Sequence, residues 1–143
     1  MAFTGNHTCT SFKLALLGGE IDFSSDTSQV FKIALYTSDA TLNADTTVYS
    51  TTNEVSATGY TALGETLTPT ITTSGTTAYI DFADVSWTSS TITARGALIY
   101  KYDNSTNPAI AVLDFGSDKT SSNSTFAVTF PTAAASSAFI RIK

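Results

Sequence analysis

Hydrophobic and polar residues alternate with a period of two along short stretches of this chain. In residues 30–36, Phe31, Ile33 and Leu35 fall on one side, each separated from the next by a single residue on the other side. Successive side chains of a β-strand point to opposite faces, so this spacing predicts a strand. The same spacing over residues 126–130 predicts another.

A β-hairpin is predicted where two runs rich in β-branched residues lie close together in the chain. Residues 65–73 and 76–82 are separated only by Ser74 and Gly75, and so short a link containing Gly is typical of a hairpin turn. Turn-forming residues divide the rest of the chain into further short candidate strands, which we place at residues 46–51, 85–88, 91–102 and 138–143.

A second predicted hairpin joins residues 96–102 to residues 109–115 across the polar loop at residues 103–108. Both runs contain apolar residues at consecutive positions. Strands that are apolar on both faces are usually covered on both sides. We therefore expect this hairpin at the centre of the fold.

Only one segment of the chain favours a helix. Residues 11–17 contain good helix formers between Ser11, a candidate N-cap, and the glycines at 18–19, which would end the helix. A strand is the alternative for so short an apolar run. With about eight strands elsewhere, the sequence predicts an all-β fold: a single-domain antiparallel β-sandwich or jelly roll with at most one short N-terminal helix.

The chain is long enough for one domain, which we place at residues 11–143, preceded by an N-terminal arm at residues 1–10. The arm has few groups able to anchor it, so we expect it to be mobile in isolation and to become ordered against a neighbouring subunit. The core is predicted to contain the alternating apolar residues of the strands: Phe31, Ile33, Leu35, Ile80, Phe82, Trp87, Leu98, Tyr100, Val112, Leu113, Phe126, Val128, Phe130, Ile140 and Ile142.

Composition narrows the classes of function. Thr and Ser account for 45 of the 143 residues, whereas charged residues make up 13% and the net charge is −5. Binding to nucleic acid requires clustered Lys and Arg, so we expect no nucleic-acid partner. No apolar run approaches the roughly 20 residues of a membrane-spanning helix, and the N-terminus lacks the pattern of a secretion signal. We therefore expect a protein made in the cytoplasm, without a membrane partner.

Residues able to perform catalysis or to bind metal are few. His7 is the only histidine and Cys9 the only cysteine, so a zinc site at this pair would lack two ligands and no internal disulfide can form. A Ser-His-Asp triad would depend on His7, which lies in the predicted arm. We therefore predict no catalytic, metal-binding or cofactor-binding residues and no enzymatic activity.

Two pairs of acidic residues and one polar loop leave alternatives open. Asp81 with Asp84, and Asp114 with Asp118, match the carboxylate pair of a glycosidase in residue type, but aspartates at strand ends more often accept backbone N–H bonds. The loop at residues 103–107 has oxygen donors for weak Ca²⁺ binding, although it lacks the spacing of an EF-hand. We favour capping and turn formation in these three places.

Arg95 is a charged residue within an otherwise apolar run. A buried arginine requires a carboxylate partner, so we favour an ion pair with Asp81, Asp84 or Asp114 from a neighbouring strand. The alternative is a contact between Arg95 and a partner protein.

Several segments together resemble a family of small virion proteins of tailed bacteriophages. The resemblance extends from about Ser11 to the C-terminus and is carried by residues 31–42, 52–56, 59–60, 92–100 and 111–116. In the family pattern a Gly-Gly pair follows the Gly-Tyr-Thr-Ala step, where this chain has Leu63 and Gly64. The resemblance implies a structural part of the particle and supplies no functional residues.

From this resemblance and the low charge we expect a virion protein made in the host bacterium, and most specifically a capsid decoration (cement) protein. It would form a homo-oligomer that contacts the major capsid protein and stabilises the head. The alternatives are a neck, tail or fibre-attachment component of the same particle, or a glycan-binding module. A module that binds host glycan needs exposed aromatic rings, for which the candidates are Tyr49, Tyr60, Tyr79 and Trp87.

Overall fold

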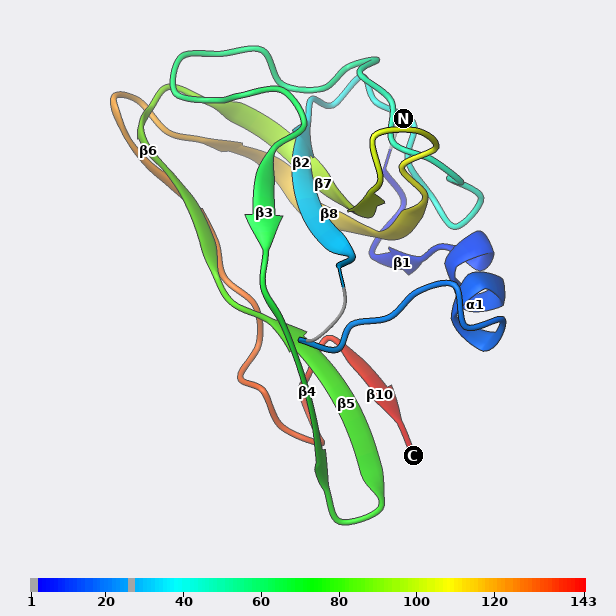
Figure 1. Cartoon of the computed structure of the whole chain (residues 1–143). Coiled ribbons are helices and arrows are strands. Elements are labelled where there is room, and N and C mark those ends of the chain that lie inside the picture. The colour runs from blue at the N-terminus through cyan, green and yellow to red at the C-terminus, as the bar shows by residue number, and fades with distance from the viewer. Residues whose placement is uncertain (1–2, 26–27) are drawn as a thin grey trace.

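Thr, Val, Ile and aromatic residues fill most of the extended segments, and their β-branched or planar side chains favour a pleated backbone. The computed structural model describes residues 3–25 and 28–143, whose strands and helix are shown in Figure 1. The elements are β1 (His7–Thr8), α1 (Thr10–Leu17), β2 (Val30–Tyr36), β3 (Glu65–Leu67), β4 (Pro69–Ser74), β5 (Thr77–Phe82), β6 (Val85–Ser90), β7 (Thr93–Tyr102), β8 (Ala109–Thr120), β9 (Ser124–Val128) and β10 (Ile140–Ile142). The strands pair antiparallel, which confirms the predicted all-β fold class with one short helix.

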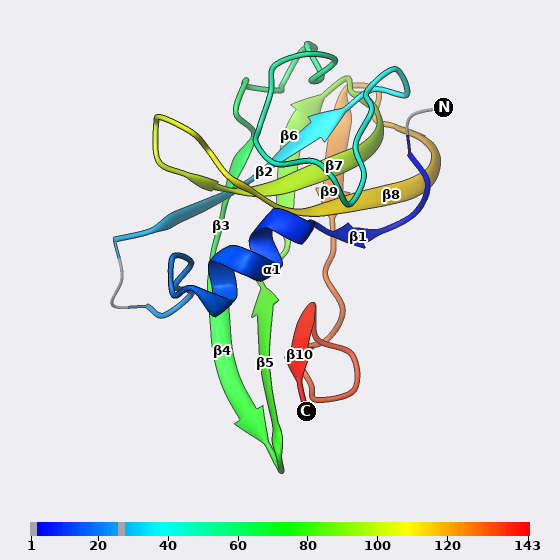
Figure 2. The same ribbon diagram turned by 90° about the vertical axis from the view of Figure 1, so that its right-hand side faces the viewer.

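The body of the molecule is a five-stranded sheet with the order β1–β8–β7–β2–β3. Its central strands pair Ala34 with Leu98 and Leu98 with Val112, and all three side chains are fully buried. α1 packs against β8, as Figure 2 shows, and the paired strands β6 and β9 contribute Trp87 and Phe126 to the same core. The hairpin of β7 and β8 therefore lies at the centre of the fold, as predicted.

A second sheet, with the order β10–β5–β4, extends away from the body in Figures 1 and 2, and we call it the distal sheet. β4 and β5 form the other predicted hairpin, in which Ile71 pairs with Ile80 and Ser74 pairs with Thr77. Gly75 opens the two-residue turn with φ +59°, a conformation that glycine adopts without strain.

Aromatic rings join the distal sheet to the body. Phe31 of β2 stacks on Phe23 with ring centroids 4.6 Å apart, and Phe23 meets Phe82 of β5 edge to face at 6.0 Å. Phe82 also contacts Phe130 and Phe139, which lie between β9 and the end of the chain. Each such pair adds about 0.5–1.5 kcal/mol beyond the area that it buries, so the base of the distal sheet is fixed to the body.

The loop at residues 37–64 closes one end of the body, at the top of Figure 1. Hydrogen bonds from tyrosine hydroxyls of the central strands hold this loop in place. Tyr36 donates to the carbonyl of Ser50 at 2.6 Å, and Tyr100 donates to the carbonyl of Leu63 at 2.7 Å. The loop is therefore held at two points far apart in its own sequence.

The predicted helix is confirmed as α1, but its N-cap is Cys9 and not Ser11. Phe12 is buried against the body, whereas Leu14 and Leu17 face solvent. The helix therefore covers part of the core with one side and leaves apolar side chains on another.

The N-terminal segment differs from the expected mobile arm. Phe3 and Cys9 are buried in the core, and β1 pairs with β8. Phe3 packs where Gly96 has no side chain, since a Cβ atom at Gly96 would lie 2.3 Å from its ring. The prediction that residues 1–10 lack anchoring groups is therefore wrong, although the first two of them lie outside the described residues.

The predicted core is confirmed with one exception. Ile142 is 63% exposed at the end of β10, so the prediction is wrong for this residue. All the other predicted core residues are buried or packed against the buried cluster. The strand expected at residues 46–51 is reduced to a single bridge between Val48 and Pro108.

Candidate interaction surface

His7 and Cys9 near the N-terminus both form hydrogen bonds with other residues of this chain. The Nε2 atom of His7 lies 3.0 Å from the hydroxyl of Thr4. Cys9 donates its N–H to the carbonyl of Ile110 at 2.9 Å, and burial raises the pKa of its thiol to about 11. Within the described residues, no three His, Cys, Asp or Glu side chains lie together as a metal site would require.

Arg95 forms an ion pair, with one predicted partner and one that was not predicted. Its Nε atom lies 4.0 Å from Asp114, and its guanidinium group bonds Asp118 at 3.4 Å. The register of β7 against β8 shifts beside Arg95, and residues 115–118 bulge opposite it. This bulge brings both carboxylates to the guanidinium group.

Asp81 and Asp84, the other candidate partners of Arg95, bond backbone N–H groups instead. Asp81 accepts from Phe82 at 3.0 Å, and Asp84 accepts from Phe130 at 2.7 Å. Asp81 is buried, and this burial raises the pKa of its carboxyl group. The favoured bond to a neighbouring backbone N–H group is therefore confirmed for Asp81, whereas Asp84 bonds a segment distant in the chain, and neither residue pairs with Arg95.

The loop between β7 and β8 is a turn closed by its own side chains. Asp103 accepts the N–H groups of Ser105 and Asn107, each at 2.9 Å, and the side chain of Asn107 accepts the N–H of Asp103 at 3.0 Å. The hydrogen bond that the backbone N–H of Asn107 donates to the Asp103 carboxylate is the main cause that lowers the pKa of this carboxyl group. The side-chain oxygens of Asp103 and Asn107 thus accept backbone N–H groups of the loop, which confirms the favoured turn.

The four aromatic residues considered for glycan stacking do not form an exposed platform. Trp87 and Tyr79 are buried. Tyr49 and Tyr60 are half-buried, and the hydroxyls of both donate to the carboxylate of Glu54. The exposed aromatic rings that a glycan-binding module would need are therefore not present at these four positions.

Glu54 is the centre of a tyrosine network that the sequence did not reveal. Its Oε1 atom accepts the hydroxyl of Tyr60 at 2.6 Å and the N–H of Leu63 at 2.9 Å, while Oε2 accepts the hydroxyl of Tyr49. Tyr49 also stacks on Tyr100, with ring centroids 4.7 Å apart. Burial first, and then the bond to Glu54, raise the pKa values of Tyr49 and Tyr60. The network fixes the loop at residues 37–64.

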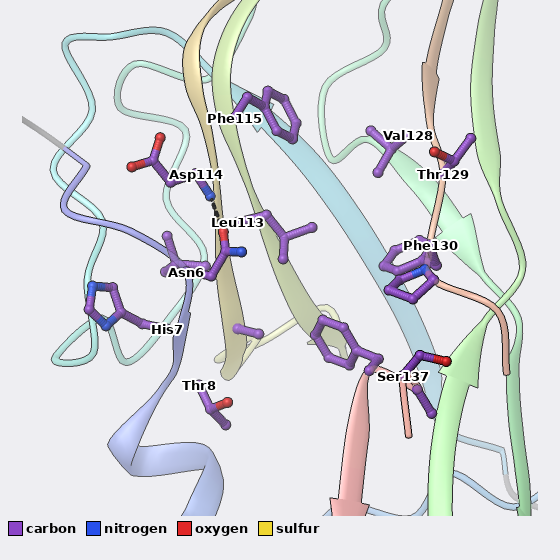
Figure 3. A pocket seen from close by; sticks show the side chains of 15 residues that line it. Asn6, His7, Thr8, Leu113, Asp114, Phe115, Val128, Thr129, Phe130 and Ser137 are labelled. Carbon is purple, nitrogen blue, oxygen red and sulfur yellow. Dashed lines mark hydrogen bonds between the residues drawn. The ribbon is translucent and has the colours of Figure 1, made fainter. Parts of the chain in front are cut away.

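A cavity of about 440 Å³ opens between β8 and the segment that follows β9, as Figure 3 shows. Leu113 and Phe115 point toward Phe130 across this space, whereas His7 and Asp114 point away from it (Figure 3). This alternation follows from the pleat of β8. The cavity is therefore a gap between strands with a mixed apolar and polar lining, and the carboxylate of Asp114 at its rim bonds Gly5, Gly116 and Arg95.

One face of the distal sheet carries Ile71, Ile80, Ile140 and Ile142, and we call it the isoleucine face. The first three lie directly opposite one another across β4, β5 and β10, and residues paired in this way point to the same side. Ile71 is 48% exposed and Ile142 is 63% exposed. Together with Leu16 of α1, these residues line a hollow of about 120 Å³.

α1 adds further exposed apolar side chains. Leu14 is 75% exposed and Leu17 is 88% exposed, although Leu16 between them lines the hollow. Burying one such side chain against a partner stabilises an association by about 1.5–3 kcal/mol. The isoleucine face, Leu14 and Leu17 therefore make up the candidate interaction surface.

Comparisons of the chain with protein-family models, with curated proteins and with solved structures found no match. In the described part of the chain, no helix is long and apolar enough to cross a membrane. A functional assignment therefore depends on the sequence pattern and on the candidate interaction surface.

Proposed function

We propose that this chain is a structural protein of a tailed-bacteriophage particle, and more specifically that it decorates the capsid as a small symmetric oligomer. Its resemblance to small virion proteins of tailed phages supports the first part. The candidate interaction surface carries the second part, because exposed apolar side chains such as Leu14, Leu17 and Ile142 are typical of contacts between proteins.

The low content of charged residues supports attachment to a protein shell. Charged residues make up 13% of the chain, and the buried centre of a protein interface is usually depleted in them. A protein that binds the assembled shell, and not its separated subunits, stabilises the shell by mass action. The partners are then the major capsid protein and further copies of this chain, in a particle assembled in the bacterial cytoplasm.

Copy number separates a decoration protein from a neck, tail or fibre-attachment component. A shell offers many equivalent symmetric positions, so decoration predicts on the order of hundreds of copies in each particle. Quantitative gel densitometry of purified particles, measured against the band of the major capsid protein, gives this number. A few to a few dozen copies would contradict capsid decoration and would favour the alternative.

A second experiment tests the candidate interaction surface itself. Phage heads that lack this protein are mixed with the purified protein, and the amount that binds is measured by co-sedimentation. The double variant Leu14→Gln, Leu17→Gln should bind at least about tenfold more weakly, because two apolar side chains are lost from the contact. The matched control is Val48→Gln, since Val48 is 45% exposed and lies outside this surface. Equal binding by the two variants would contradict attachment through α1.

A further inference from the structure

Among the residues that the structure describes, no strand pairs with the outer edge of β4, the last strand of the distal sheet. The carbonyl of Thr68 accepts the N–H of Ala83 at 3.1 Å, so Thr68 faces the chain of β5. Because the register of β4 against β5 is continuous, every second residue after Thr68, including Thr72, also directs its N–H and C=O groups toward β5. In an antiparallel pair, alternate residues bond the partner strand, and the residues between them direct their N–H and C=O groups the other way. Ile71 and Thr73 therefore direct both backbone groups outward.

Within residues 3–25 and 28–143, this edge lacks the features that usually prevent strands of different molecules from pairing, namely charged side chains, bulges and cover by other elements. Residues 66–80 contain no Asp, Glu, Lys, Arg or His. The β4–β5 register is continuous, and residues 70–74 are exposed. Pro69 blocks pairing only at the first residue of β4. By contrast, the opposite edge of the sheet carries Arg141 on β10.

A second copy of this chain fits the edge by charge and by geometry. The net charge of −5 makes identical copies repel each other where charged surfaces meet, whereas an uncharged strand approaches its own copy without this cost. Antiparallel pairing of a strand with itself is self-complementary, since the outward N–H groups of Ile71 and Thr73 meet carbonyls of the other copy. The distal sheet also projects from the body, which leaves β4 accessible (Figures 1 and 2).

We propose that two copies pair antiparallel through their β4 strands and so join two three-stranded distal sheets into one continuous sheet. The isoleucine face then continues across the joint, because Ile71 lies on the edge strand of each copy. This proposal rests on the proposed function, for which it names the contact between copies in the symmetric oligomer.

Removal of one outward N–H group tests the pairing. Thr73→Pro removes an N–H that does not bond β5, and Thr73→Ala is the matched control that keeps it. Sedimentation equilibrium of the purified wild-type chain should show a dimer. Its dissociation constant should rise at least about tenfold in Thr73→Pro, since the symmetry removes two hydrogen bonds, and should stay within about threefold in Thr73→Ala. A monomeric wild-type chain, or equal dimerisation of both variants, would overturn the proposal.

A charge at the edge gives a second test, which does not depend on whether the fold tolerates proline. Ile71→Lys places a lysine on the edge strand β4, and Ile142→Lys places one on the same face of the sheet at β10. Ile71→Lys should weaken the dimer at least about tenfold and Ile142→Lys by less than about threefold. Circular dichroism verifies that both variants are folded. Equal weakening by the two would overturn pairing through the edge in favour of packing through the face.

Amide hydrogen exchange distinguishes pairing through the edge from any other dimer. The amides of Ile71 and Thr73 should exchange slowly at concentrations where the dimer forms and rapidly after dilution. Rapid exchange within the dimer would overturn the proposal. Binding to phage heads is measured separately. A dimer with protected amides that does not bind heads would contradict only the proposed function, whereas heads that bind the chain as a monomer would contradict only the pairing of β4.

Discussion

Leu63 and Gly64, where the proposed phage family would have a Gly-Gly pair, both have positive φ angles. Leu63 has φ +78°, which costs a non-glycine residue on the order of 1 kcal/mol or more. Hydrogen bonds to Glu54 and from Tyr100 hold it there. Gly64 lies against β2, where a Cβ atom would come within 1.8 Å of the carbonyl oxygen of Ile33. The close approach to β2 therefore requires glycine at position 64 but not at position 63.

At the scale of single residues, Gly64→Ala is expected to lower the free energy of unfolding by about 3 kcal/mol or more, because strain at positive φ adds to a clash with the backbone of β2. Gly75→Ala is the control. Gly75 has φ +59° but no atom within 4 Å of an added Cβ, so its loss should be about 1 kcal/mol. Urea denaturation of both variants measures the difference, and equal losses would contradict the close approach.

Among the elements, β1 and residues 3–6 before it are an integral part of the body despite their short length. Phe3 fills the space above Gly96 in β7, and the N–H of Gly5 donates to the carboxylate of Asp114 at 3.0 Å. Cys9 is completely buried immediately before α1. This segment therefore contributes both apolar burial and polar bonds to the central sheet.

Phe3→Ala should accordingly lower the free energy of unfolding by about 3 kcal/mol, since it removes a buried aromatic side chain and leaves a cavity. The control is Thr4→Ala, at an exposed position, where the change should stay within about 0.5 kcal/mol. Thermal and chemical unfolding measure both. If Phe3→Ala were as stable as the control, the N-terminal segment would be loose after all.

The elements also differ in how far the sequence could predict them. β2 and β9 could be predicted because their apolar residues recur at every second position. β1 could not, since two residues have no period and their partner β8 is distant in the chain. Asp118 reaches Arg95 only because the register of β7 against β8 shifts. The tyrosines around Glu54 come together only when the loop at residues 37–64 folds back onto the body. Residue spacing specifies neither of these.

Across the whole molecule, the tyrosine network couples side-chain ionisation to stability. Burial is the largest cause that raises the pKa values of Tyr36, Tyr49, Tyr60 and Tyr100. When folding raises the pKa of an acid, the unfolded chain loses its proton first. Stability is therefore unaffected below the ordinary tyrosine pKa of about 10 and decreases as the pH rises above it.

An alkaline titration should show this coupling directly. Tyr36 and the three tyrosines of the network are expected to ionise together, above pH 10 and in the same transition as the loss of β-structure, because the folded state excludes their charged forms. Tyrosinate absorbance and far-ultraviolet circular dichroism measure the two events in one sample. Ionisation of these four residues in a chain that keeps its β-structure would contradict the network.

The two-residue turn between β4 and β5 is a suitable site for inserting a foreign peptide that the protein would display on its surface. A Cβ atom added at Gly75 would have no atom within 4 Å apart from its chain neighbours, so the turn offers room for inserted residues. The entropy of loop closure rises by only about 0.6 kcal/mol for each doubling of loop length, so a foreign epitope would cost the fold little. The turn stands at the end of the distal sheet farthest from the body (Figure 1). On a decorated capsid, every copy would then carry its epitope clear of its own domain, in a dense and regular array suited to a vaccine particle.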